Sequence, residues 1–298
     1  MIMEINATRY SDKFSFVIDG ASYIGDPRPN TAMFVSKKIG RLIMALDRVD
    51  KCLVFAESGL DVSNDLLQKH CFVFSDHPQR DYARLTKELY ELEEKKYANI
   101  EYHIEGGAII SKSATIGKGS IIEPGVVIGP GVVVGERAHI YAGVVIKNSI
   151  IGNDVIINEG SIVGGNGFTM AEDEHGDKIR IYSLGKVVIG NDVEIGANNN
   201  ISRGSGGNTI IDDSVKMDAL VHIGHDVHLH KNVEITAGVV VGGFVDVQEG
   251  AYIGINSVIR NRIELGAHCF IGMGATVTKS VDDGVTVIGN PAKPFIKK

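Results

Sequence analysis

The sequence predicts a mainly β protein: a left-handed parallel β-helix built from six-residue repeats, preceded by a small α/β domain. Three observations support this fold class. Apolar residues recur at six-residue spacing over long stretches, the 298 residues include 36 glycines and no tryptophan, and the pattern changes near residue 100. Many glycines together with many Val and Ile residues favour a narrow core of stacked aliphatic side chains, with small residues where the chain turns.

The six-residue repeat is the strongest of these observations. Twelve successive positions at this spacing are apolar: Ile211, Met217, Ile223, Leu229, Ile235, Val241, Val247, Ile253, Ile259, Leu265, Ile271 and Val277. A second series runs upstream from Ile104 to Ile146, slips by one residue to Ile151 and resumes at Ile189. At 44% apolar content, twelve such positions arise by chance with a probability on the order of 10⁻⁴ or less. A triangular coil of three short strands explains the spacing, and it stacks each residue on the one three repeats further along the chain.

The pattern divides the chain into three parts. Residues 1–100 are predicted to form an α/β domain, with strands at 51–57 and 71–76 and helices at 37–48 and 80–96. Residues 101–288 are predicted to form the β-helix, and residues 289–298 a C-terminal tail. Two segments without the repeat, 165–187 and 203–210, are expected to be loops. The longer one is expected to be functional, because long loops in compact domains usually are.

Composition excludes some classes of function. The net charge of −7 argues against nucleic acid as the main partner. We expect a cytoplasmic protein without a stable membrane span, because no apolar stretch is long enough to cross a bilayer and the N-terminus does not resemble a signal peptide. The three cysteines show no paired spacing, which predicts reduced thiols.

Residues 217–230 hold the densest cluster of reactive side chains, including four histidines. His225 lies two positions after the inward-facing Ile223, near a predicted corner, and Gly243 lies three repeats further on. Stacking would place an imidazole, a suitable general base, beside a glycine amide that can hold an oxyanion. Asp218 is a candidate to fix the imidazole tautomer. The alternative is that these histidines only face solvent, which is the expectation for His222, His228 and His230.

Two other kinds of site have weaker support in the sequence. A metal site is not expected, because His222 and His228 share a phase but fall on successive faces of the coil. Residues 285–295 contain Pro291 and Pro294, which would stiffen the end of the chain, and Lys293, which offers a cation for phosphate. This segment is therefore either a structural cap or part of a coenzyme site.

The chain from about residue 15 to 280 resembles the UDP-3-O-acylglucosamine N-acyltransferases of lipid A biosynthesis. The matching segments are residues 30–39, 77–90, 164–197, 201–204 and 216–227. The resemblance implies that His225 is the catalytic base, that Asp218 is its carboxylate partner and that the Gly243 amide binds the oxyanion. It also implies that Asn166 and Phe168 approach the sugar, and that Phe34, Ser36 and Lys38 lie in the segment that contacts uridine.

The chain also departs from that family. Ile39 replaces a tyrosine near the uracil, Ser36 an asparagine, and Arg262 a second histidine, so Ser36 and Arg262 are expected at the substrate. The ending VIGNPAKP resembles that of CoA-dependent hexapeptide acetyltransferases instead of the family's C-terminal helices, which dock acyl carrier protein. This ending predicts that Gly289, Asn290 and Lys293 bind CoA.

These departures favour a homotrimeric N-acyltransferase that uses acyl-CoA and a dTDP- or UDP-linked amino-deoxysugar. Its product would serve surface glycan synthesis, such as the O-antigen of lipopolysaccharide. The alternatives are the lipid A enzyme with a hydroxyacyl carrier protein as donor, a non-catalytic β-helix scaffold, and a sugar nucleotidyltransferase fused to a β-helix.

Overall fold

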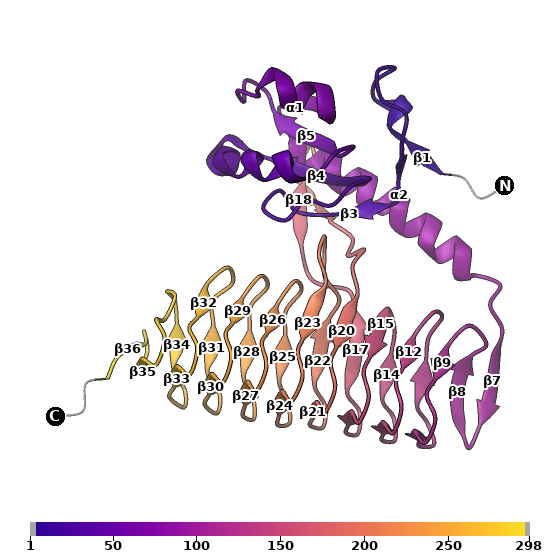
Figure 1. Cartoon of the computed structure of the whole chain (residues 1–298), viewed down its shortest axis with the longest axis vertical. Helices are drawn as coiled ribbons and strands as arrows, with labels where there is room; N and C mark the ends of the chain where they lie inside the picture. Colours follow the sequence, from indigo (N-terminus) through magenta and orange to yellow (C-terminus); the bar gives the residue numbers. More distant parts are fainter. Residues whose placement is uncertain (1–3, 296–298) are drawn as a thin grey trace. The chain divides into compact units, whose positions relative to one another are not determined.

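The computed structural model describes residues 4–295 and divides into two compact units (Figure 1). The first unit comprises Met1–Asn99, Phe168–Gly185 and Ser205–Gly207, and the second comprises Ile100–Gly167, Lys186–Gly204 and Asn208–Lys298. The ends of two predicted parts, residues 1–3 of the α/β domain and 296–298 of the tail, lie outside the described residues.

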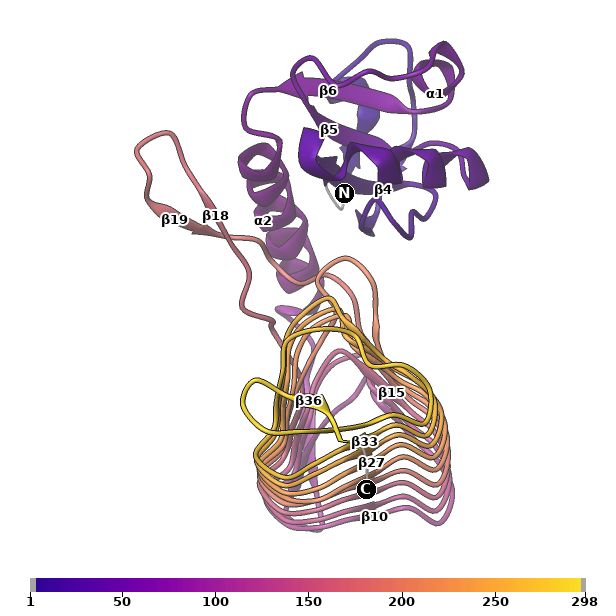
Figure 2. The same ribbon diagram turned by 90° about the vertical axis from the view of Figure 1, so that its left-hand side faces the viewer.

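The second unit is a parallel β-helix whose coils have a triangular outline when viewed along the axis (Figure 2). Its strands form three sheets, each in the order in which neighbours pair. The first sheet contains β10 (Ile121–Ile122), β13 (His139–Ile140), β16 (Ile156–Ile157), β21 (Glu194–Ile195), β24 (Lys216–Met217), β27 (Glu234–Ile235), β30 (Tyr252–Ile253), β33 (Phe270–Ile271), β35 (Thr286–Ile288) and β36 (Lys293–Pro294). The second contains β34 (Thr276–Val277), β31 (Val258–Ile259), β28 (Val240–Val241), β25 (His222–Ile223), β22 (Asn200–Ser202), β17 (Ile162–Gly165), β14 (Val145–Ile146), β11 (Val127–Ile128), β8 (Ala108–Ser111) and β7 (Tyr102–Glu105). The third contains β32 (Glu264–Leu265), β29 (Asp246–Val247), β26 (His228–Leu229), β23 (Thr209–Ile211), β20 (Val187–Ile189), β15 (Ser149–Ile151), β12 (Val133–Val134) and β9 (Thr115–Ile116).

The register of these sheets explains the six-residue repeat. Ile122 pairs with Ile140, three repeats further along the chain, and the one-residue slip appears where Val134 pairs with Ile151. All twelve positions of the series that begins at Ile211 are buried, and they line one continuous core. Ile104 is an exception. Its side chain is 77% exposed because β7 pairs antiparallel with β8 instead of continuing the coil, so the prediction of an inward position was wrong there.

The first unit contains a four-stranded parallel sheet of β3 (Gly20–Ala21), β4 (Thr31–Val35), β5 (Leu53–Glu57) and β6 (Cys71–Ser75). Two short strands, β1 (Ile5–Asn6) and β2 (Val17–Ile18), pair antiparallel. The helices are α1 (Asn64–Lys69), α2 (Pro78–Tyr97) and the 3₁₀ segments η1 (Ala7–Arg9) and η2 (Lys37–Arg48). The strands predicted at 51–57 and 71–76 and the helix at 80–96 are present. The helix predicted at 37–48 is instead 3₁₀, with non-helical backbone angles at Ile39.

Both segments without the repeat leave the β-helix. The long one forms a β-hairpin of β18 (Met170–Glu172) and β19 (Lys178–Arg180), a detail that the sequence did not predict. Ala171 and Ile181 share a hydrophobic core with Tyr82 and Leu85 of α2. The hairpin therefore belongs to the first unit, whereas the predicted division grouped it with the β-helix domain. In the shorter segment, the Gly206 carbonyl accepts a hydrogen bond from the Arg28 guanidinium.

Cysteines and apolar helices behave simply in this structure. Cys52, Cys71 and Cys269 are buried and free, and burial raises the pKa of the Cys52 thiol to about 12. Thiols in such surroundings are inert at neutral pH. Within residues 4–295, no helix combines the length and apolar character that crossing a membrane requires.

Candidate functional site

The centre of the candidate site is His225, at the corner that follows β25 and precedes β26. Its Nδ1 donates a hydrogen bond to Oδ2 of Asp226 over 2.7 Å. The side chain of His225 is 15% exposed and that of Asp226 is 5% exposed. The Asp226 backbone N–H in turn bonds to the Thr209 hydroxyl over 3.0 Å, which fixes the corner. A neutral imidazole that donates from Nδ1 carries its lone pair on Nε2, so His225 is oriented to act as a base through Nε2.

Gly243 lies beside this imidazole, as the stacking of successive coils predicted. A Cβ built at Gly243 would lie 2.8 Å from Nε2 of His225 and 2.9 Å from its Cε1. Only a residue without a side chain allows this approach. Among the described residues, no hydrogen-bond acceptor faces the Gly243 N–H. An amide that is not used by the fold and lies beside the base is a suitable donor for an oxyanion.

A second glycine backs the imidazole. A Cβ at Gly167 would lie 2.9 Å from Cβ and 3.0 Å from Cγ of His225. The start of the ejected segment therefore passes directly along the ring, and Asn166, predicted to approach the sugar, is the preceding residue. The sequence interpretation did not identify Gly167. A larger residue at this position would displace the imidazole.

Phe244 and Arg262 extend the site along the axis. The Phe244 ring lies edge-on to His225, with centroids 5.2 Å apart and planes at 89°. The Arg262 guanidinium carbon lies 4.1 Å from the centroid of the Phe244 ring, a cation–π distance. Asp226, Phe244 and Arg262 occupy the same corner of three successive coils, and all three adopt positive φ angles there. The stacking rule that located Gly243 also locates Phe244, which the sequence interpretation overlooked.

The carboxylate assigned to His225 from the sequence is corrected by the structure. Asp218 follows β24 and so lies at the preceding corner of the coil, one face away from His225. Its Oδ1 accepts the Ala219 N–H over 2.7 Å. Asp226 is the carboxylate bonded to the imidazole. The signal was available in the sequence, because an Asp directly after the histidine shares its corner.

A second histidine lies close to the first. His222, in β25, has its pKa lowered by burial and by the nearby His225. A lowered pKa keeps His222 neutral at pH 7, so it adds no positive charge beside the base. The sequence interpretation had treated it only as solvent-facing.

The first unit contains a pocket of its own, with a volume of about 500 Å³. Phe34 and Ser36 line it, as expected for the nucleotide-contacting segment, together with Arg80 and Lys178. Carboxylates of Glu57, Asp76 and Glu172 also face the pocket. The ring of Phe34 lies 5.2 Å from that of Tyr82, which supports it from behind. The pocket thus offers an aromatic wall and two cations.

Two residues predicted at the substrate lie differently. Lys38 does not line this pocket. Phe168 is 80% exposed, and the Arg180 guanidinium lies 5.7 Å from its ring centroid. Both residues remain predictions as substrate contacts.

The segment predicted to bind CoA forms a tight turn at the end of the first sheet. Gly289, with a φ of +91°, and Asn290 lie in the turn between β35 and β36, and Lys293 pairs with Ile288. The three residues are exposed or partly exposed at the last coil. Their role in CoA binding remains a prediction.

Comparisons with known proteins support the fold and the resemblance. Residues 113–148 match the family model described as bacterial transferase hexapeptide (six repeats). The chain is 34% identical over 153 residues to a UDP-3-O-acylglucosamine N-acyltransferase of Methylorubrum extorquens, covering 51% of this chain and 43% of that protein. It is 37% identical over 149 residues to UDP-3-O-acylglucosamine N-acyltransferase 2 of Legionella pneumophila, covering 50% and 43%. The matches thus span less than half the length of these relatives.

Solved structures give the same fold. LpxA from Acinetobacter baumannii superposes with a TM-score of 0.58 at 26% identity, covering 64% of this chain and 73% of that one. The UDP-N-acetylglucosamine acyltransferase of Francisella novicida superposes with a TM-score of 0.59 at 27% identity, covering 65% and 70%.

These likenesses confirm the predicted left-handed parallel β-helix and the predicted resemblance to the lipid A acyltransferases. The chain carries bacterial transferase hexapeptide repeats, and its β-helix is similar to that of the UDP-3-O-acylglucosamine N-acyltransferases.

Proposed function

We propose that this protein is an N-acyltransferase that moves an acyl group from a thioester to the amino group of a UDP-linked glucosamine. The observation that carries the proposal is the arrangement at one corner: a carboxylate-bound imidazole beside an unused glycine amide. The names of the relatives support the choice of acceptor. They favour UDP-3-O-acylglucosamine over the dTDP- or UDP-linked amino-deoxysugar that the sequence departures suggested.

The reaction follows from the geometry of this corner. Nε2 of His225 removes a proton from the sugar amine as its nitrogen attacks the thioester carbonyl carbon. The carbonyl oxygen becomes an oxyanion and accepts the Gly243 N–H. The carbon–sulfur bond then breaks, and the imidazolium returns the proton to the leaving thiolate. Asp226 stabilises the imidazolium without accepting its proton. The products are an amide and a free thiol.

For the donor, we propose an acyl group on acyl carrier protein, in keeping with the lipid A reaction, with acyl-CoA as the competing donor. We propose that the pocket lined by Phe34 and Ser36 receives the nucleotide. Its aromatic wall suits a base, and Arg80 and Lys178 suit phosphate. The carboxylates at its rim suit sugar hydroxyls.

We further propose that the protein works as a homotrimer. The outer surface of the second sheet, which carries His222, is apolar over much of its length. Ile109, Ile162, Val240 and Val258 on this surface are each 39–43% exposed. An exposed apolar row of this kind favours association with another copy of the chain. Val258→Asp should lower the mass measured by light scattering from that of a trimer to that of a monomer.

The function is tested with the purified chain, UDP-3-O-acylglucosamine and either acyl carrier protein thioester or acyl-CoA, with the product identified by mass spectrometry. We expect N-acylation with the carrier-protein donor and a fall of about 10²–10⁴-fold in His225→Ala. His139→Ala is the matched control, because His139 also pairs with a carboxylate, that of Glu123, but on a different sheet. Activity only with acyl-CoA would overturn the donor proposal. Full activity in His225→Ala would overturn the mechanism.

A further inference from the structure

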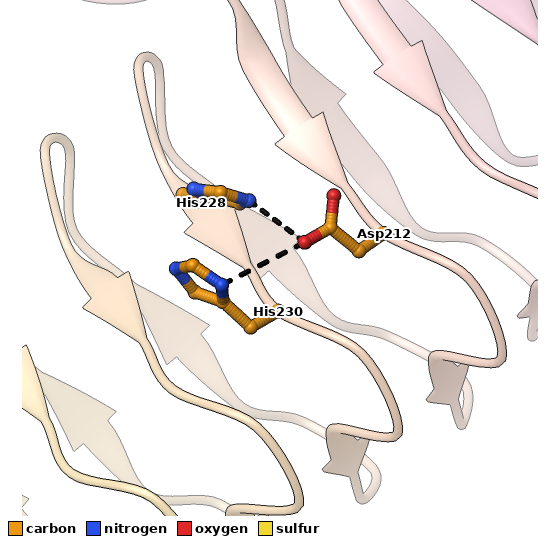
Figure 3. A group of neighbouring side chains, drawn as sticks. All are labelled: Asp212, His228 and His230. Carbon is orange, nitrogen blue, oxygen red and sulfur yellow. Dashed lines mark hydrogen bonds and ion pairs between the residues drawn. The ribbon is translucent and has the colours of Figure 1, made fainter.

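A group of three side chains on the third sheet lies apart from the site described above. Asp212 follows β23, while His228 begins β26 and His230 follows it. Because His228 and His230 are two residues apart on an extended strand, both side chains point outward on the same face. Figure 3 shows that both rings turn a nitrogen toward the same oxygen of Asp212. All three residues are partly buried.

The distances in this group suit a metal ion. Nε2 of His228 lies 3.0 Å from Oδ2 of Asp212, and Nδ1 of His230 lies 3.7 Å from the same oxygen. Ligand atoms about 2.0–2.1 Å from a tetrahedral ion lie about 3.3 Å from one another, a value between the two observed distances. One ligand atom from each residue falls within 4.8 Å of the others. Small side-chain rotations would therefore bring the three atoms onto one ion.

A fourth residue holds one of the imidazoles from behind. Nε2 of His230 lies 2.8 Å from Oδ1 of Asp246, in β29. With Nε2 donating to this carboxylate, Nδ1 carries the lone pair and faces Asp212. Metal-binding histidines usually donate their second N–H to a carboxylate in this way. The rings of His228 and His230 also stack, with centroids 3.7 Å apart and planes tilted by 27°, which limits their motion.

We propose that Asp212, His228 and His230 bind one divalent transition-metal ion of the Zn²⁺ type, with water completing the tetrahedron. Two imidazoles and one carboxylate suit Zn²⁺ and its neighbours, whereas Mg²⁺ and Ca²⁺ take oxygen ligands. The repeat pattern alone predicted no metal, because it was applied to His222 and His228, which lie on different faces. The ligands that converge are His228 and His230 on one face.

This site is separate from the proposed acyltransferase centre. Asp226 precedes β26 and His230 follows it, so the strand lies between the two sites. The ion would join three consecutive coils, because its ligands and their support come from β23, β26 and β29. An ion that binds only the folded chain raises the temperature of unfolding, by an amount that grows with its affinity and concentration. Its role is therefore to clamp these coils together.

The test is titration of the tag-free full chain with Zn²⁺, followed by calorimetry and by metal analysis after dialysis. We expect one ion per chain, a rise in melting temperature, and X-ray absorption that shows imidazole ligands at about 2.0–2.1 Å. Asp246→Asn keeps all three ligands and should weaken binding about 10- to 100-fold. His228→Ala and His230→Ala should weaken it further.

His139→Ala is again the matched control, since it removes another imidazole–carboxylate pair, one without a second histidine. It should leave Zn²⁺ binding unchanged. The proposal is overturned if the wild type retains no ion at micromolar Zn²⁺, or if His228→Ala and His230→Ala, shown by circular dichroism to be folded, bind as tightly as the wild type. Acyltransfer by the metal-free chain is measured in parallel, so that a failure of this proposal is distinguishable from a failure of the proposed function.

Discussion

Replacing Gly243 by alanine should damage catalysis without damaging the fold. The new Cβ would lie 2.8 Å from Nε2 and 2.9 Å from Cε1 of His225, whereas ordinary contacts begin near 3.4 Å. The imidazole must therefore move by at least about 0.6 Å, the difference between 3.4 Å and 2.8 Å. Alanine keeps the backbone N–H, so the oxyanion donor is still present. The change thus tests the position of the base.

Displacements of about 1 Å in an active site cost on the order of 10²-fold in rate. For Gly243→Ala we expect kcat to fall about 10- to 100-fold, with KM changed much less. The assay is steady-state acyl transfer at saturating donor, with melting temperature measured on the same samples. Gly20→Ala is the control, because a Cβ there would meet only the Thr31 methyl, at 4.0 Å. A variant with kcat within threefold of the wild type would refute the view that Gly243 packs against a catalytic imidazole.

Three further predictions concern single side chains. Asp226→Asn should lower kcat by about 10²-fold or more, because an amide NH₂ facing Nδ1 reverses the tautomer; an unchanged pH–rate profile in this variant would contradict that role. The pKa of buried His70 is lowered, chiefly by burial, and its Nδ1 accepts the Cys52 N–H. Its contribution to stability is therefore complete above about pH 6.5 and is lost as the pH falls below it. Hydrogen exchange of β4 and β5 should accelerate between pH 7 and 5 and do so less in His70→Gln; equal acceleration in both would refute the assignment. The buried Ser257 hydroxyl has no hydrogen-bond partner among residues 4–295, so Ser257→Ala should leave the free energy of unfolding unchanged or raise it by up to about 1 kcal/mol. Ser161→Ala, which removes a bonded hydroxyl, should lower it by about 1–3 kcal/mol, and urea titrations compare the two.

The sequence predicts the β-helix well because one rule governs the whole unit. Inward positions recur every six residues, so each buried residue in the series from Ile211 is specified by its neighbours above and below. The same rule locates Gly243 beside His225. It fails at Ile104, where the chain enters the first coil as an antiparallel strand and no previous coil enforces the register.

The ejected segment follows no such rule. Residues 168–185 carry no repeat, and their structure depends on apolar contacts with α2, which lies far away in the sequence, before the first coil. Local patterns do not specify contacts of that kind. The choice between Asp218 and Asp226 depended on which corner each residue occupies. A count of corners along the coil resolves it, whereas closeness in sequence to a cluster of histidines does not.

The ladder of the third sheet continues undisturbed across the ejected hairpin. Ile151 pairs with Ile189 in the same parallel register that joins Val134 to Ile151, although the intervening chain is about twice as long. Whatever leaves the coil at that corner returns to the same place. Such an architecture separates inheritance of the catalytic framework from inheritance of selectivity, since a lineage can lengthen, shorten or exchange the excursion while the imidazole and its glycine stay aligned.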